Sequence, residues 1–174
     1  YDERFHLDWA RRLLTSGETE RLSHPNFDSK TPLTVANVLA RRLARHGLGI
    51  QDERWLVFAT RLPGVVWLGG ILLIVFAIGR RTLGPDAARV ATTLVALDSN
   101  LIAHAALAQV DVGYAFGALA TVSAAWMLWR RPTLANAVVL GAATGMAFVA
   151  KFAAVLLAPA VAWPLVAALI GWRP

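Results

Sequence analysis

The chain contains no cysteine and few charged residues for its length of 174. The lack of cysteine excludes both a disulfide framework and a metal site built from thiolates. Charged residues make up 16% of the sequence and hydrophobic residues 57%. Soluble domains carry about 25% charged residues. We therefore expect an integral membrane protein.

Acidic residues are scarce in the last two thirds of the chain. Residues 1–55 contain eight acids and nine basic residues, and the rest contains only the acids Asp86, Asp98 and Asp111. We therefore divide the chain into a water-facing segment, 1–55, and a membrane segment, 56–174. The net charge of +6 does not indicate nucleic-acid binding, because the arginines are scattered or stand at the ends of apolar runs instead of clustering.

The first segment lacks the apolar run of a signal peptide. We expect a long loop with two amphipathic helices that lie on the membrane surface. In the first helix, Phe5, Trp9 and Leu13 recur every four residues. The second is expected over residues 31–47, with a proline in its first turn and a glycine at its end. Because the chain has no initiator Met, we also expect a fragment of a longer multi-span protein.

The membrane segment predicts about five spans, at residues 56–79, 87–104, 112–129, 134–149 and 152–171. The connecting segments at residues 80–89, 130–133 and 171–174 contain six arginines, whereas the opposite turns contain only Lys151. The positive-inside rule makes the arginine turns cytoplasmic. The first segment, the turn between the second and third spans, and Lys151 should then share the outer face.

Residues 96–111, ALDSNLIAHAALAQVD, place two acids, an asparagine and a histidine between apolar segments. Ionisable groups at membrane depth cost about 2.5–3.5 kcal/mol each, so such groups are usually functional or lie in a wet cavity. Carboxylates beside basic side chains can deprotonate a hydroxyl and also hold an anionic phosphate. Transfer of a sugar from a lipid phosphate needs both abilities.

Five short motifs occur in order: Asp2-Glu3, Lys30-Thr31-Pro32-Leu33, Gly79-Arg80 with Gly84, residues 96–111, and Ala150-Lys151-Phe152. In this order they resemble the dolichyl-phosphate-mannose protein mannosyltransferases and their bacterial relatives, which include the lipid A aminoarabinose transferases. All are GT-C membrane glycosyltransferases. The chain departs from that pattern at Asp98-Ser99, where relatives usually carry a proline-containing turn, and at Gln109-Val110, where Thr or Asn is common.

The resemblance implies an all-α, polytopic membrane bundle of the GT-C type. It implies an enzyme that moves a sugar from a polyprenyl-phosphate donor to an acceptor hydroxyl on the outer face, with inversion of the anomeric carbon. The acceptor would be a protein, a lipid or a glycan, and membrane lipids would be further partners. The expected location is the bacterial inner membrane, with the site on the periplasmic face.

The resemblance also implies roles in the first segment. Asp2 is the general base toward the acceptor hydroxyl, Glu3 its catalytic neighbour, and Lys30 a contact to the donor phosphate. The structural alternatives are a helix N-terminal charge for Asp2 and solvated side chains for the other two. No cofactor is assigned, but a divalent metal stays open, with His6 beside Asp2 as an incomplete ligand pair.

Further site residues are expected in the membrane segment. Arg61 and Lys151 would contact the donor phosphate, or else extend to the membrane interface. Asp111, His104 and Asp98 would lie near the acceptor or support the site. The alternative for Asp111 is a helix cap, and for His104 it is a satisfied core histidine. Asp98 and Asn100 could instead only terminate a helix at the interface.

Two other function classes are compatible with the sequence. A transporter or flippase would use Asp98, His104 and Asp111 as a proton or ion relay, and would show broken helices or repeated halves. A non-catalytic assembly subunit would tolerate neutralisation of its outer acids.

Overall fold

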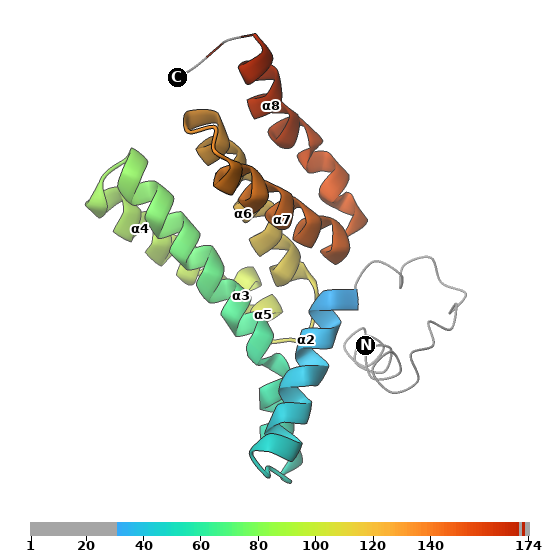
Figure 1. Cartoon of the computed structure of the whole chain (residues 1–174). Coiled ribbons are helices and arrows are strands. Elements are labelled where there is room, and N and C mark those ends of the chain that lie inside the picture. The colour runs from blue at the N-terminus through green and yellow to red at the C-terminus, as the bar shows by residue number, and fades with distance from the viewer. Residues whose placement is uncertain (1–30, 171, 173–174) are drawn as a thin grey trace.

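The computed structural model describes residues 31–170 and Trp172, and all regular structure in that part is helical. It comprises seven α-helices, a π-helical turn and a 3-10 helix (Figure 1). The elements are α2 (Thr31–Arg42), η1 (Leu43–Gly47), α3 (Glu53–Thr82), α4 (Pro85–Ala96), α5 (Ser99–Ala105), α6 (Asp111–Arg130), α7 (Leu134–Ala150), η2 (Phe152–Leu157) and α8 (Ala158–Leu169). The all-α expectation is confirmed.

Two helices, α3 and α6, are long and apolar enough to cross a membrane, and α7 and residues 152–167 form shorter apolar helices. Helix α3 begins where the Asp52 carboxylate accepts a hydrogen bond of 2.8 Å from the Arg54 backbone N–H. Only 17% of the most apolar window of α3 is buried by the rest of the chain. Its apolar surface therefore faces outward, which suits lipid better than the core of a soluble domain.

Residues 31–47, expected as one helix, form α2 followed by η1, and this unit lies alongside the first half of α3 (Figure 1). Ala44 of η1 packs in a buried cluster with Leu56 and Ala59 of α3. The Arg41 guanidinium donates to the Glu53 carboxylate over 2.6 Å. The helix is thus held against α3 by both apolar and ionic contacts.

Residues 87–104, expected as a single span, are divided between α4 and α5. Helix α4 begins after Gly84, whose φ of 94° is a left-handed conformation that glycine adopts without strain. The division follows from Asp98, which has extended backbone (φ −65°, ψ 113°) and accepts a hydrogen bond of 2.8 Å from the Leu101 N–H. An N-cap in this position starts a new helix instead of continuing the old one.

The fifth expected span, residues 152–171, also differs from a single α-helix. Lys151 ends α7 with extended backbone (φ −157°, ψ 132°), and the chain continues through η2 into α8. A 3-10 turn winds more tightly than an α-helix and is usually short. The residues after Lys151 therefore begin in a different helical geometry from that of α8.

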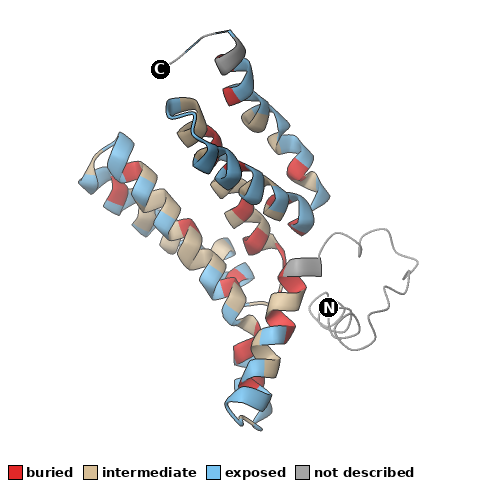
Figure 2. Ribbon diagram, in the orientation of Figure 1, coloured by how far each residue is buried: buried red, intermediate tan, exposed pale blue. Residues whose placement is uncertain are grey.

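Small residues set how closely the helices approach. At Gly117 of α6, an added Cβ would lie 3.1 Å from the Ala147 backbone of α7. At Gly64 of α3, it would lie 2.5 Å from the Ala105 carbonyl oxygen of α5. Buried residues follow these contacts, and the outer surfaces are largely exposed (Figure 2). The first contact joins α6 to α7, and the second joins α5 to α3.

Candidate functional site

An ion pair joins the beginning of α6 to the end of α7. The Lys151 ammonium donates to Asp111 Oδ1 over 2.9 Å, across 40 residues of sequence. Asp111 is the first residue of α6, and Arg130 is the last. The pair therefore lies at the opposite end of α6 from its arginine turn, and Asp111 and Lys151 share one end of the molecule.

The local sequence explains why these two side chains meet. Helices α6 and α7 pack antiparallel with Gly117 against Ala147, so the N-terminus of one lies beside the C-terminus of the other. Leu33 of α2 packs against Val110 and Ala150, which flank the ion pair in sequence. The N-termini of α2 and α6 therefore converge beside the Lys151 ammonium.

His104 extends the cluster from the last turn of α5. Its Nδ1 lies 3.0 Å from Gln109 Oε1 and 3.9 Å from Asp111 Oδ2. The side chains of His104, Asp111 and Lys151 are 48%, 41% and 47% exposed. An ion pair with this much exposure contributes about 0–1 kcal/mol to stability, so the cluster adds little to folding and stays accessible to a ligand.

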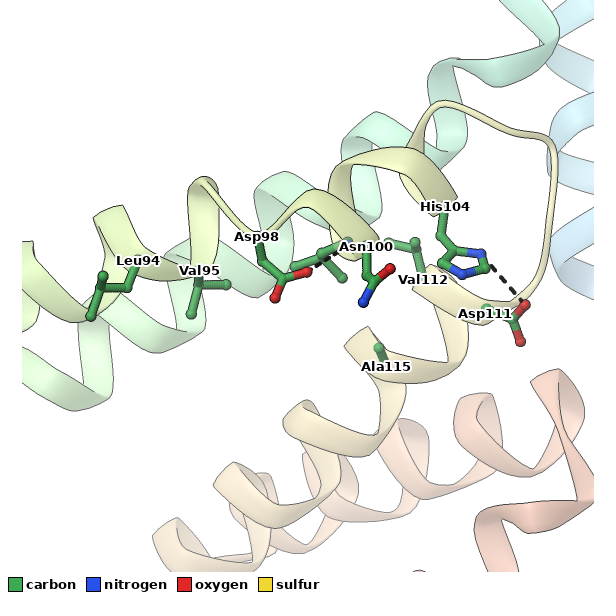
Figure 3. Close-up of a pocket in the computed structure, with 9 residues that line it drawn as sticks. Leu94, Val95, Asp98, Asn100, His104, Asp111, Val112 and Ala115 are labelled. Atoms are coloured by element: carbon green, nitrogen blue, oxygen red, sulfur yellow. Dashed lines mark hydrogen bonds and ion pairs between the residues drawn. The ribbon is translucent and has the colours of Figure 1, made fainter.

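An open groove of about 590 Å³ lies beside the cluster, between α4–α5 and the start of α6 (Figure 3). Its volume falls within the range of about 300–1,000 Å³ that small-molecule sites have. The lining mixes apolar and polar side chains. The nine lining residues are the apolar Leu94, Val95, Leu101, Val112 and Ala115 and the polar Asp98, Asn100, His104 and Asp111.

The structure brings together most of the site residues expected in the membrane segment. Asp98, His104 and Asp111 line the groove, and Lys151 is bonded to Asp111. Arg61 is partly buried in α3 and does not line the groove. The expected residues Asp2, Glu3, His6 and Lys30 lie outside the described residues.

Two contributions to the site were not assigned from sequence. Asn100 lines the groove, whereas the sequence indicated only the end of a helix there. Gln109 holds the His104 ring, although its amide had stood out only as a departure from the family pattern. Their spacing in the sequence could have identified them, because both residues fall within five positions of His104.

No group of three or more His, Asp or Glu side chains that could hold a metal ion occurs among residues 31–170 and Trp172. The two candidate metal ligands His6 and Asp2 lie outside the described residues. The polar groups in the described part of the site are two acids, two amides, an imidazole and one lysine.

Asp98 caps the N-terminus of α5, and the contribution of this cap to stability can be measured separately from sugar transfer. We expect Asp98→Ala to lower the free energy of unfolding by about 1 kcal/mol, because the Leu101 N–H loses its capping acceptor. For a chain of this size that corresponds to a fall of about 2–4 °C in the thermal midpoint. Thermal unfolding of the detergent-purified protein measures it. Asp98→Ser retains a cap and should unfold close to the native midpoint; an equal fall in both variants would contradict the capping role.

A family model for dolichyl-phosphate-mannose-protein mannosyltransferase matches residues 50–173 of the chain. The match runs over more than two thirds of the sequence and includes every residue that lines the groove, as well as the Asp111–Lys151 pair. No curated protein and no solved structure matches the chain.

Proposed function

Because the chain belongs to the dolichyl-phosphate-mannose-protein mannosyltransferase family of integral-membrane glycosyltransferases, we propose that it transfers a sugar at its extracytoplasmic face. Members of this family use dolichyl- or polyprenyl-phosphate-linked sugars. The acceptor is a hydroxyl of a protein, lipid or glycan, and the anomeric carbon inverts. The proposed location is a bacterial inner membrane, with the site on the periplasmic side.

The Asp111–Lys151 pair is the observation that carries this proposal. A lysine ammonium has three N–H donors, and the hydrogen bond to Asp111 uses one of them. The side chain of Lys151 is about half exposed, so its other donors can reach a phosphate. The positive end of the α6 dipole lies beside it and favours an anion in the same place.

The proposed reaction uses these groups together with residues of the first segment. In the proposed mechanism Asp2 takes the proton from the acceptor hydroxyl, with Glu3 as its neighbour. The hydroxyl oxygen bonds to the anomeric carbon while the bond from that carbon to the phosphate oxygen breaks. Attack opposite the leaving group inverts the carbon. Lys30, Arg61 and Lys151 stabilise the charge that develops on the departing polyprenyl phosphate.

Asp111 acts in this scheme through Lys151. Its carboxylate lines the groove and accepts a hydrogen bond from the ammonium, and His104 lies 3.9 Å from its second oxygen. His104 and Asp98 support the site from the groove lining. The acid therefore positions a phosphate contact instead of meeting the phosphate itself.

Membranes containing the protein, incubated with radiolabelled polyprenyl-phosphate sugars, test the proposal. Label should pass to an acceptor, and Lys151→Gln should lower the rate about 10- to 100-fold, because one charged hydrogen bond to the phosphate is lost. Lys151→Arg keeps the charge and should retain more activity than Lys151→Gln. Arg131→Gln, in the turn at the other end of α6, serves as a control with a near-native rate.

Two outcomes would contradict the proposal in different ways. Undiminished transfer by Lys151→Gln would show that Lys151 does not contact the phosphate. No transfer from any donor by folded native protein would contradict the function itself. It would then favour the transport hypothesis, for which the break before α5 and the acids beside His104 provide a candidate relay.

A further inference from the structure

The groove beside α5 is lined by both apolar and polar side chains. Leu94 and Val95 lie at one end, and Asn100 and His104 lie toward the other end near Asp111, which we call the polar end (Figure 3). No lysine or arginine is among the nine lining residues. A phosphate inside the groove would meet the carboxylates of Asp98 and Asp111, and the Lys151 ammonium that contacts Asp111 is not part of the lining. The lining therefore suits an uncharged group that carries hydroxyls.

The contacts of His104 leave one ring nitrogen available to such a group. Two acceptor oxygens lie near Nδ1, that of Gln109 at 3.0 Å and that of Asp111 at 3.9 Å. In the neutral imidazole the proton therefore belongs on Nδ1, because an amide oxygen and a carboxylate can only accept. Nε2 then keeps its lone pair and can accept a hydrogen bond from a hydroxyl.

Asn100 complements this nitrogen. Its side chain is exposed in the groove lining, and its amide makes no hydrogen bond to another described residue. An unused amide offers two donors and a carbonyl acceptor. Together with Nε2 of His104, it can bind adjacent hydroxyls that each donate one hydrogen bond and accept another.

We propose that this groove binds the sugar ring of the polyprenyl-phosphate donor, and that Asn100 and His104 form hydrogen bonds with the hydroxyls of the sugar. The inference rests on the proposed function and adds where the sugar lies and which residues select it. Asp111 connects the two parts of the donor site, because it lines the groove and also bonds to Lys151 over 2.9 Å. A phosphate held by Lys151 therefore leaves its sugar at the polar end of the groove.

The test compares two lipids that differ only in the sugar. Binding of a polyprenyl-phosphate sugar and of the same polyprenyl phosphate without sugar is measured on the purified protein by competition with a labelled donor. We expect Asn100→Ala and His104→Ala each to weaken binding of the glycosylated lipid about 3- to 10-fold. Binding of the sugar-free lipid should stay within twofold of native, which also shows that the variants fold. Lys151→Gln should weaken binding of both lipids.

Ile102→Ala is the matched control, because Ile102 lies on the same short helix, is exposed and does not line the groove. It should bind both lipids as the native protein does. Equal losses for both lipids in Asn100→Ala, or no loss for either, would overturn the sugar site. A raised KM for the acceptor alone would assign the groove to the acceptor and overturn it as well. If the native protein bound neither lipid, the proposed function would fail, and the sugar site with it.

Discussion

Asp2→Asn should lower sugar transfer by about two to four orders of magnitude, the range that general bases contribute. Asparagine has nearly the shape of aspartate and can still accept a hydrogen bond from the acceptor hydroxyl, but it cannot take the proton. Asp2→Asn should therefore lower kcat, while the affinity for the polyprenyl-phosphate sugar stays close to native. Initial rates with a radiolabelled donor, together with donor binding to the same preparation, separate the two effects.

Two other acids of the first segment make this experiment specific. Glu3→Gln should cause a smaller loss than Asp2→Asn, because Glu3 is proposed as the neighbour of the base. Asp8→Asn changes the net charge equally and has no proposed role in the reaction, so its rate should be near native. If transfer survived in Asp2→Asn, the base would have to be another group, and the acids that line the groove would be tested next.

Gly64→Ala should destabilise the protein by about 1–3 kcal/mol, as overpacking at a tight contact does. The new Cβ would lie 2.5 Å from the Ala105 carbonyl oxygen and 3.4 Å from that of Leu107, and both are backbone atoms that cannot turn aside. Helix α5 would have to move away from α3. Because α5 carries Asn100 and His104, transfer should fall together with the thermal midpoint, which unfolding in detergent measures.

Gly69→Ala is the matched control on the same helix. No atom lies within 4 Å of a Cβ added there, and alanine favours a helix over glycine by about 0.8–1 kcal/mol. We expect a thermal midpoint equal to native or higher, with native transfer. If both variants behaved alike, the contact between α5 and α3 would not be what positions the groove.

Local sequence determined much of the fold. The low content of charge and the long apolar runs require helices, because a backbone in lipid must satisfy its hydrogen bonds within itself. Asp111 at the start of α6 and the arginines at the end of α6 follow from the ends of one apolar run. The second helix of the first segment could be placed from its proline and glycine alone. The division at Asp98 could not, since its side chain can cap a helix or simply lie at the end of one.

The chemistry of the site was also partly readable from sequence. Asp98, His104 and Asp111 are conspicuous because ionisable groups are rare in such an apolar segment, and all three line the groove. Asn100 and Gln109 were less conspicuous, because a neutral amide costs little at the end of a helix. What each amide does depends on which way its side chain points.

The sequence by itself determined the helical class, the sided distribution of charge and the family resemblance, because these depend on composition and on short ordered motifs. Only the tertiary structure decided that Lys151 bonds to Asp111 and that the groove forms beside α5. The first contact depends on α6 and α7 packing closely at Gly117, and the second on α5 resting on Gly64. Hydropathy gives the depth of a helix in the membrane but not its rotation or its neighbours, and these decide which side chains meet.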